Sequence, residues 1–538
     1  MPARTLDGDQ AMAYGALVAG VKVVTSYPGS PSSGTVEALA GLAEAHSIHV
    51  EWSSNEKVAA EVAIGASIAG RRALVAAKSV GLNVMLDPLM ALNLTPVHGG
   101  LVILLGDDPG GYGSQNDQDS RPLALLLETP LLEPAGPAEG FAMMREAFAA
   151  SERLRMPVIV RITRSFTQQA EAVEVPDGPF QQPDLGLASE PWRFVPVPRN
   201  VVAKHRELHT RLEQAGRWAE GLPFNQLFGA GELGIAGVGF AYRKLLEALG
   251  DEPPEGLRVL KLGALYPLPA SLVGRLLAGC REVLVVEETE PFVEARIKAI
   301  AHDIGSGAKV LGKESGHLPR EGELFRWQIQ RALRRFLPEF APAREYVEAD
   351  EAAERPRRES HCAGCRYGEL LDALQAAAAE LGEDPLLIGD PGCLATVADR
   401  LHAKYAIGSA VGVADGLRRA GLDRRAVALF GDSSFFHTTL PAIVNAVVGR
   451  SDIVMVVLDN GATVTSGFQP NPGVGRDALG RPAPALSNER VAAACGVEFV
   501  RAIGPDAPAA DLRAAFRAVL AHPGLGLLVV RTRCDRHS

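Results

Sequence analysis

Two short motifs in the last third of the sequence place oxygen-bearing side chains at a suggestive spacing. Gly431, Asp432 and Ser433 follow the apolar run AVALF, Asp459 and Asn460 follow the run IVMVVL, and Asp432 and Asn460 are 28 positions apart. Because the carboxyl ends of neighbouring parallel strands meet at one edge of a sheet, we expect the carboxylate and the carboxamide to lie together. Mg²⁺ prefers oxygen ligands and is often shared with a bound phosphate group. The spacing therefore favours a magnesium and diphosphate site over two unrelated strand-end turns.

Residues beside these motifs could complete such a site. The backbone carbonyl of Ala462 would supply a third oxygen ligand. Gly431 has no side chain, so the backbone there can approach a diphosphate closely. The negative charge of that group also suits the N-terminus of the helix that should follow.

Four of the six cysteines stand at informative places, although six are too few for a disulfide scaffold in 538 residues. Cys362 and Cys365 form a CxxC pair, and Cys393 and Cys534 follow apolar runs of the same segment. The pair fits a zinc half-site, a redox pair or half of an iron–sulfur site. Zinc would normally require a second close pair. Cys495 precedes an apolar run and is more simply a core cysteine.

The elements that must position these residues follow an α/β pattern. Short apolar strands alternate with amphipathic helices in three segments, which predicts parallel sheets flanked by helices. We expect domains at residues 1–175, 223–342 and 361–538, joined by linkers at 176–222 and 343–360. The first linker begins proline-rich and should continue as one amphipathic helix over 200–221. The expected strands are 21–27, 73–77, 100–107, 157–163, 234–239, 259–269, 282–288, 386–390, 426–432, 453–460, 497–503 and 525–532.

Composition excludes several classes of protein. Hydrophobic residues make up 47% and charged residues 22%, which is typical of globular domains and excludes overall disorder. The net charge of −10 argues against a nucleic-acid partner bound through phosphate neutralisation. No apolar run approaches the ~20 residues of a membrane helix, and the first residues lack the apolar core of a signal peptide. We therefore expect a soluble, cytoplasmic protein.

The run GDSSFFHTTLPAIVNAVVGRSDIVMVVLDNGATVTSGFQPNPG resembles the thiamine-diphosphate domain of the α subunits of indolepyruvate:ferredoxin oxidoreductases, a family of thiamine-dependent 2-oxoacid oxidoreductases. Other stretches agree in the family's order along nearly the whole chain, among them GALVAGVKVVTSYPGSPSS, EWSSNEKVAAEVAIGAS and DDPGGYGSQNDQDSR. The resemblance implies that the three expected domains bind the coenzyme's pyrimidine, resemble the transketolase C-terminal domain, and bind the diphosphate, in that order.

The resemblance implies a catalytic role for Glu56, which matches the family's glutamate in SSNEKVAAEVAIGAS. A buried carboxyl group at this place hydrogen-bonds N1′ of the aminopyrimidine and favours the tautomer that removes the proton from C2. Glu61 is the alternative for this role.

The resemblance also implies residues that bind substrate and cofactor. Ser30 matches a position where a hydroxyl group helps to hold the substrate's carboxylate. Lys78 and Arg121 could pair with the same anion or form ordinary ion pairs. His437 could contact the diphosphate or the substrate, or be structural. The candidate cofactor-binding positions are Gly408, Gly431, Asp432, Ser433, Asn460 and Ala462, with Asp432, Asn460 and Ala462 as magnesium ligands.

Related oxidoreductases bind a four-iron, four-sulfur cluster beside the thiamine with a CxxC pair and two further cysteines. Cys362, Cys365 and Cys393 match three of these, and Cys534 is the fourth candidate with Cys495 as its alternative. Unliganded buried cysteines are the alternative to a cluster. The family's α subunit usually continues into a ferredoxin-like module, whose CxxCxxCxxxCP runs this sequence lacks. We therefore expect one cluster that passes electrons to ferredoxin, another external acceptor or a partner subunit.

The expected activity is oxidative decarboxylation of an aryl 2-oxoacid, such as indolepyruvate or phenylpyruvate, to the acyl-CoA. The expected ligands are thiamine diphosphate, Mg²⁺, one 4Fe–4S cluster and coenzyme A, and the expected partner is a smaller β subunit. One alternative is a non-oxidative decarboxylase, which needs neither cluster nor coenzyme A. A catalytically silent scaffold subunit is the other, and the presence of Glu56, Asp432 and Asn460 disfavours it.

Overall fold

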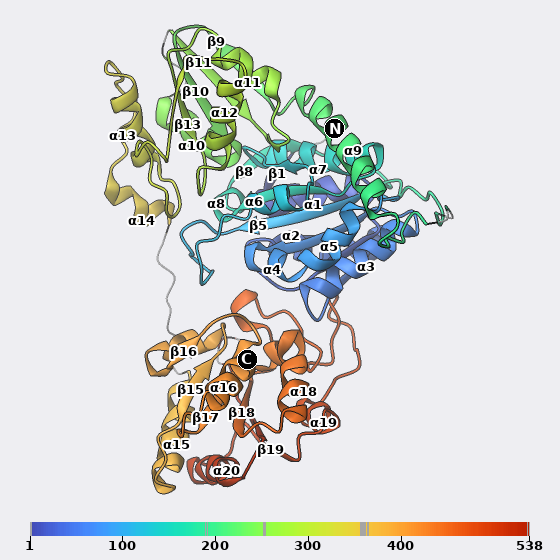
Figure 1. Ribbon diagram of the computed structural model, residues 1–538, viewed down its shortest axis with the longest axis vertical. Helices are drawn as coiled ribbons and strands as arrows, with labels where there is room; N and C mark the ends of the chain where they lie inside the picture. Colours follow the sequence, from blue (N-terminus) through green and yellow to red (C-terminus); the bar gives the residue numbers. More distant parts are fainter. Residues whose placement is uncertain are drawn as a thin grey trace. The chain divides into compact units, whose positions relative to one another are not determined.

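The computed structural model describes residues 3–188, 190, 192–250, 254, 256–355, 362, 365–534 and 536. The chain divides into two compact units, residues 1–358 (unit 1) and 359–538 (unit 2). Unit 1 contains two sheets and a two-stranded ribbon, and unit 2 contains one sheet (Figure 1). The expected α/β fold with mainly parallel sheets is confirmed. Among the helices of the described residues, none combines the length and apolar character that a membrane span needs.

The first sheet of unit 1 has seven strands in the order β12-β6-β7-β5-β4-β2-β3, all parallel except β12. Every residue of β5 is buried, as expected for a central parallel strand covered on both faces. The strands are β2 (Val23–Ser26), β3 (His49–Trp52), β4 (Ala73–Lys78), β5 (Leu101–Asp107), β6 (Leu131–Leu132), β7 (Val158–Thr163) and β12 (Ala264–Tyr266). The helices are α1 (Gly8–Val18), α2 (Ser33–His46), α3 (Glu56–Ile68), α4 (Ser79–Val84), α5 (Leu86–Asn93), α6 (Pro122–Leu126), α7 (Pro137–Leu154) and α8 (Arg164–Thr167). The ribbon pairs β1 (Ala3–Asp7) with β8 (Ala170–Glu174).

The second sheet of unit 1 has five strands in the order β14-β13-β10-β11-β9, with β9 antiparallel. Its strands are β9 (Gln226–Gly229), β10 (Leu233–Val238), β11 (Leu257–Leu262), β13 (Glu282–Val286) and β14 (Lys309–Leu311). The helices around it are α10 (Gly239–Leu249), α11 (Ala270–Leu277), α12 (Phe292–Asp303) and α13 (Arg326–Phe336). The expected helix of the first linker is present as α9 (Val201–Glu220).

One run of unit 1 that was expected as a single strand contributes to both sheets. The run expected as one strand over 259–269 divides into β11 in the second sheet and β12, which pairs antiparallel with β6 in the first. The first two expected domains therefore lie in one compact unit, and their boundaries stay a prediction. Residues 343–355 of the second expected linker contain η1 (Glu348–Asp350) and α14 (Glu351–Glu354). Residues 356–360, like His361 at the expected start of the third domain, lie outside the described residues.

The sheet of unit 2 has six parallel strands in the order β16-β15-β17-β18-β20-β19. They are β15 (Leu386–Gly389), β16 (Ala403–Lys404), β17 (Ala426–Gly431), β18 (Ile453–Asp459), β19 (Phe499–Ile503) and β20 (Gly526–Arg531). The helical segments are α15 (Tyr367–Glu380), η2 (Cys393–Arg400), α16 (Ser409–Arg419), α17 (Asp432–Ser434), η3 (Phe435–Thr439), α18 (Leu440–Val448), η4 (Val464–Ser466), α19 (Asn488–Ala494) and α20 (Ala509–Ala521).

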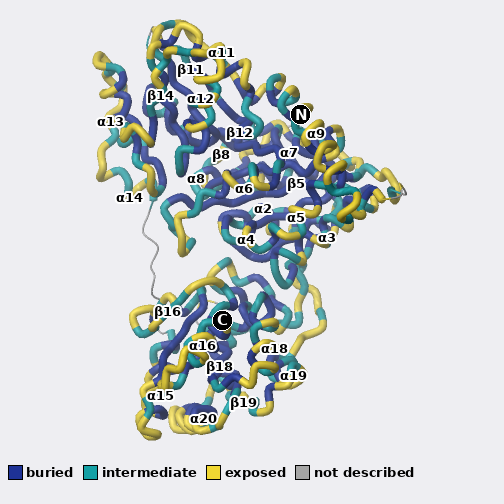
Figure 2. Tube along the Cα trace, in the orientation of Figure 1, coloured by how far each residue is buried: buried dark blue, intermediate teal, exposed yellow. Residues whose placement is uncertain are grey.

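Alternate residues of the strands β15, β17, β18, β19 and β20 enter two separate cores. In β17, Val427 and Leu429 pack with α15 and α20, whereas Ala428 and Phe430 pack with α16 and α18 on the opposite face. This period of two is the geometry of a strand whose side chains point to opposite faces. The strands are accordingly buried between more exposed helices (Figure 2). Both faces are filled, so the strand ends are the places where polar residues can gather.

Candidate functional site

The carboxyl edge of the sheet in unit 2 collects residues from four neighbouring strands. The strands β15, β17, β18 and β20 are consecutive and parallel. Cys393, Asp432, Asn460 and Cys534 follow them in that order, each within four residues of its strand's end. The sequence-based expectation that Asp432 and Asn460 meet at one sheet edge is confirmed, because β17 and β18 are direct partners.

Asp432 is a buried carboxylate that faces a second carboxylate. Asp432 and Asp459 both line a cavity of about 240 Å³, and the Asn471 amide donates a 2.7 Å hydrogen bond to Asp432 Oδ2. Burial raises the pKa of Asp432 to about 7, and the charge of Asp459 contributes. Burial also raises the pKa of Asp459. Two enclosed carboxyl groups destabilise each other when ionised, and a divalent cation between them would relieve that repulsion.

The other expected magnesium ligands, Asn460 and Ala462, follow β18, the strand next to the one that Asp432 follows. Asn460 Nδ2 lies 3.3 Å from the Tyr367 hydroxyl oxygen, and Asn460 Oδ1 lies 3.4 Å from the backbone nitrogen of Ala462. Ser433 Oγ lies 2.9 Å from Thr463 Oγ1, so the segments after β17 and β18 are tied together. A Cβ at Gly431 would meet open space, which leaves room for a ligand against this backbone.

The donor set at this edge fits Mg²⁺. It consists of the oxygens of a carboxylate, a carboxamide and a backbone carbonyl, which are the ligands that Mg²⁺ prefers beside phosphate oxygens. No softer donor than oxygen belongs to the expected set of Asp432, Asn460 and Ala462. Asp459 adds a second carboxylate to the cavity beside Asp432, and Arg531 lines the same cavity.

The three other candidate cluster cysteines lie close enough to Cys393 to act on it electrostatically. Burial raises the pKa of Cys393 to about 12, and the charges of Cys365, Cys534, Cys362 and Asp432 act in the same direction. The backbone N–H of Cys365 donates to the carbonyl of Cys362 (3.1 Å). Among the described residues, no three cysteine sulfurs lie within 4.8 Å of one another.

The structure separates the two candidates for the fourth cysteine. Cys534 follows β20 and its charge acts on Cys393. Cys495 instead packs among the apolar side chains that α16 and α18 bury on one face of the sheet, whereas Cys365 and Cys393 pack against the core on the other face. This arrangement supports Cys534 as the partner of the CxxC pair.

Asp390, which follows β15, organises the neighbouring loop. Its carboxylate accepts hydrogen bonds from the backbone N–H groups of Gly408 (2.7 Å) and Ala410 (2.8 Å). Burial raises the pKa of Asp390 to about 6, which the nearby His437 opposes. Gly408 has a φ of +79°, and a Cβ there would clash with Thr438, so only glycine fits this turn. His437 is buried, with Nδ1 3.2 Å from Thr438 Oγ1.

The carboxyl edge of the first sheet in unit 1 brings together Glu56, Lys78 and Ser30. Glu56 begins α3 after β3 and is 4% exposed. Lys78 ends β4, and a Cβ added at Gly29, beside Ser30, would lie 2.8 Å from its Cγ. The strands β4, β2 and β3 are neighbours, so their ends supply one contiguous group. Glu61, the alternative to Glu56, is half-exposed and forms an ion pair with Lys57.

Gly81 in α4 leaves the space that the Glu56 carboxylate occupies. A Cβ at Gly81 would lie 2.5 Å from Glu56 Oε1. Any larger residue at position 81 would therefore displace the Glu56 carboxylate from its present place.

Arg121 is bound to acceptors of the protein itself, whereas a residue that binds the substrate's carboxylate would need free donors. Its side chain is fully buried, and its nitrogens donate to Asp119, to Glu287 (2.8 Å) and to the carbonyl of Glu290. Of the two interpretations that the sequence left open, the structure agrees with the ion pair, since β13 of the second sheet ends beside Glu287. We therefore do not retain Arg121 as a ligand of the substrate's carboxylate.

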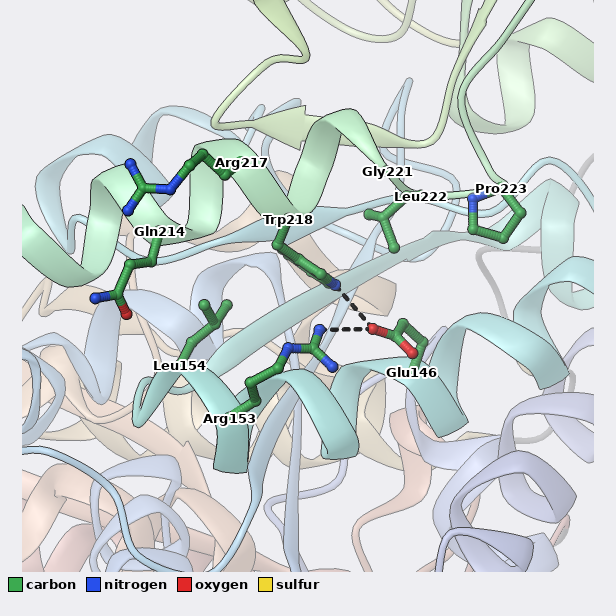
Figure 3. A pocket seen from close by; sticks show the side chains of 9 residues that line it. All are labelled: Glu146, Arg153, Leu154, Gln214, Arg217, Trp218, Gly221, Leu222 and Pro223. Atoms are coloured by element: carbon green, nitrogen blue, oxygen red, sulfur yellow. Dashed lines mark hydrogen bonds and ion pairs between the residues drawn. The ribbon is translucent and has the colours of Figure 1, made fainter.

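A larger cavity of about 540 Å³ in unit 1 contains none of the candidate residues. It lies between α7 and α9, where Trp218 Nε1 and Arg153 donate to the same oxygen of Glu146 (2.8 and 3.0 Å) (Figure 3). Its residues carry no nucleophile or pair of acid and base, so its size does not make it the reactive site.

Sequence reasoning missed four residues that shape the two sheet edges. Asp459 supplies a second carboxylate beside Asp432, and Asn471 donates a hydrogen bond to Asp432. Asp390 accepts the hydrogen bond that fixes the loop at Gly408, and Gly81 leaves space for the Glu56 carboxylate. Asp390 follows a strand in the same way as Asp432 and could have been found by that rule. Asn471 lies in a loop 39 positions beyond Asp432, and no local pattern marks it.

Two segments of the chain match known protein families. Residues 14–192 match the family described as pyruvate flavodoxin/ferredoxin oxidoreductase, thiamine diphosphate-binding, and residues 400–530 match the C-terminal TPP-binding domain of thiamine pyrophosphate enzymes. Thiamine-diphosphate-binding domains are therefore present at both ends of the chain.

Curated relatives match over nearly the whole length. Indolepyruvate oxidoreductase subunit IorA of Methanothermobacter marburgensis is 36% identical over 98% of this chain and 86% of its own. The subunits IorA of Methanothermobacter thermautotrophicus (37% identical, 93% and 81%) and Pyrococcus abyssi (34% identical, 98% and 85%) are similar. Among solved structures, a 2-oxoglutarate:ferredoxin oxidoreductase from Magnetococcus marinus covers 58% of this chain and 62% of its own at 15% identity, with a TM-score of 0.47. Because the curated relatives match this chain over nearly its full length, it belongs to the family of the indolepyruvate oxidoreductase subunits IorA, and it is a subunit of an oxidoreductase enzyme.

Proposed function

We propose that this chain is the thiamine-dependent large subunit of an enzyme that oxidatively decarboxylates an aryl 2-oxoacid such as indolepyruvate or phenylpyruvate. The overall reaction converts the 2-oxoacid and coenzyme A to the acyl-CoA and CO₂ and delivers two electrons to an acceptor. The names of the full-length relatives support the substrate class. A smaller β subunit, a cytoplasmic location and ferredoxin or another external acceptor belong to the same proposal.

Unit 2 would hold the diphosphate through Mg²⁺. Asp432, Asn460 and the carbonyl of Ala462 would supply the protein oxygens, with Gly431 and Ser433 beside the phosphates. Asp390 fixes the turn at Gly408, and so orients the start of α16. When bound, thiamine diphosphate supplies a nucleophilic carbon and an acceptor for the electrons left by CO₂.

Unit 1 would supply the acid–base group and part of the substrate site. Glu56 would hold a proton against the coenzyme's pyrimidine, since its carboxylate is buried in a space that exists only because Gly81 has no side chain. Ser30 and Lys78 would bind the substrate's carboxylate, because a hydroxyl and an ammonium group from adjacent strand ends can both donate to one anion. His437 in unit 2 would contact the diphosphate or the substrate.

Electrons would leave through one 4Fe–4S cluster bound by Cys362, Cys365, Cys393 and Cys534. The observation that supports this proposal most directly is that Cys393, Asp432, Asn460 and Cys534 follow four adjacent parallel strands, so two of the four thiols lie at the same sheet edge as the magnesium ligands. Asn460 links the two groups, with Nδ2 3.9 Å from Cys393 Sγ. Four thiolates are what such a cluster requires.

The iron content of the anaerobically purified full chain tests the proposal. We expect about four iron atoms per chain, the number in one such cluster, and a large loss of iron in Cys393→Ser. Cys495→Ser is the matched control, because it removes a partly buried cysteine that packs on the opposite face of the sheet. Equal iron in wild type and Cys393→Ser would refute the ligand set. Less than about one iron atom per chain, with thiamine diphosphate bound, would favour the non-oxidative decarboxylase.

A further inference from the structure

Two histidines and a glutamate converge at the surface of unit 1, and none of them belongs to the proposed active site. His205 and His209 lie one turn apart on α9, and Glu128 follows α6. The two oxygens of Glu128 lie 2.8 Å from His205 Nε2 and 3.0 Å from His209 Nε2. One ligand atom from each residue lies within 4.8 Å of the other two.

The arrangement of the rings brings two imidazole nitrogens to one carboxylate. Residues four apart on a helix share a face, and the ring centroids of His205 and His209 are 4.3 Å apart. If both rings were charged to pair with Glu128, they would repel each other at this distance. A single cation accepts electron pairs from both neutral rings and from the carboxylate, so it satisfies all three groups together.

The backbone holds Glu128 in position for this contact. The N–H groups of Glu128 and Thr129 donate to the carbonyls of Leu125 (3.1 Å) and Ala124 (3.0 Å), which closes the end of α6. Glu128 has a φ of +47°, at a helix-end position where glycine is most common. Its side chain is 23% exposed, whereas those of His205 and His209 are 49% and 57% exposed, so water can reach the site.

We propose that Glu128, His205 and His209 bind a divalent first-row transition-metal ion, with water completing the coordination. Two imidazoles and one carboxylate with an open position suit Zn²⁺, and Co²⁺ and Ni²⁺ use the same ligands. The ion would fasten α9, which leads from the first sheet of unit 1 to the second, to the end of α6. Its role would be structural, because none of its three ligands is among the residues proposed for the reaction.

Titration of the full chain with Co²⁺ under anaerobic conditions tests this site. Nitrogen and oxygen ligands give visible d–d absorption, whereas cysteine ligands add an intense near-ultraviolet charge-transfer band, so the spectrum separates this site from the cysteines of unit 2. The variants are His205→Gln, His209→Gln and Glu128→Gln. The matched control is His49→Gln, which removes an exposed imidazole paired with one carboxylate, that of Glu51 (2.9 Å).

We expect wild type and His49→Gln to bind one Co²⁺ with d–d bands and without a thiolate band. The three site variants should bind it at least about tenfold more weakly, the smallest loss typical even of outer-shell partners. Co²⁺ should raise the thermal midpoint of wild type and His49→Gln and leave those of the site variants unchanged. Titrations that are the same in wild type, His205→Gln and Glu128→Gln, or bands that appear only with thiolate absorption, would overturn the proposal. The site side chains are at least partly exposed, so metal-free thermal midpoints check that each variant folds.

Discussion

Asp9→Asn should stabilise the protein increasingly as the pH rises from 5 to 7. Asp9 lies in the first turn of α1, and its Oδ1 accepts a 2.8 Å hydrogen bond from the hydroxyl of Thr35. Its other oxygen packs so closely against Gly34 that a Cβ there would clash with it. Burial raises the pKa of Asp9 from 3.8 to about 7.

The sign follows from where the proton is held. Between pH 4 and 7 the folded chain keeps a proton on Asp9 that the unfolded chain has lost, so stability falls as the pH rises through this interval. The difference between a pKa of 3.8 and one of about 7 is equivalent to about 4 kcal/mol, an upper limit because Asp9 is only partly buried. Asparagine cannot ionise and escapes this cost. The advantage of the variant should grow by at most about 1.4 kcal/mol per pH unit and level off above pH 7.

Urea-unfolding midpoints of wild type and Asp9→Asn, measured from pH 5 to 8.5, test this expectation. Midpoint differences are the appropriate measure, because a chain with two compact units has no single free energy of unfolding. Asp177→Asn is the control, since the side chain of Asp177 is 72% exposed. A difference between Asp9→Asn and wild type that stays constant across this range would refute the reasoning.

Four further substitutions probe the reaction and the stability of unit 1. Glu56→Gln should lower the rate of 2-oxoacid decarboxylation by about 10²- to 10⁴-fold, measured as turnover in the presence of the partner subunit, because it removes the acid–base group. Gly81→Ala should lower the same rate by about 10²-fold with an unchanged circular dichroism spectrum, since the added Cβ displaces the Glu56 carboxylate; wild-type turnover would contradict this. Arg161→Met should destabilise unit 1 by about 3–5 kcal/mol in chemical denaturation, because it leaves two buried carboxylates unpaired. Lys57→Met, which breaks an exposed pair, should change stability by less than about 1 kcal/mol.

The strands and their polar ends were predictable because both rest on local patterns. A buried parallel strand is a continuous apolar run, and the residue after it lies at the sheet's carboxyl edge by geometry. This is why the sequence located Asp432 and Asn460 on neighbouring strands. The same reasoning placed Lys78 after a strand of the first sheet, whereas the strand before Glu56, β3, was not predicted. The roles of both residues came from a resemblance and stay predictions.

Contacts made through tertiary structure were not predictable. β12 joins the first sheet although the sequence places it directly after β11, because Gly263 between them allows the chain to turn against Phe224. The role of Arg121 depended on a partner 166 positions away, Glu287, whose strand belongs to another sheet. Glu128 and His205 are likewise 77 positions apart. Neither composition nor periodicity contains such pairings.

The strand order of unit 2 explains how residues far apart in sequence can serve one reaction. Neighbouring strands lie about 4.8 Å apart, so the ends of the four consecutive strands β15, β17, β18 and β20 fall within about 15 Å. Asn460 stands in the middle of this row, close to Tyr367 and Cys393 and one residue beyond Asp459. Asp432 and Asn460 follow the two inner strands of this row, and Cys393 and Cys534 follow the two outer ones. Under the proposed function, an electron released at the magnesium ligands would therefore have only a short path to a thiol on either side. Separating the two groups would require a different order of strands, which makes the sheet topology itself part of the proposed chemistry.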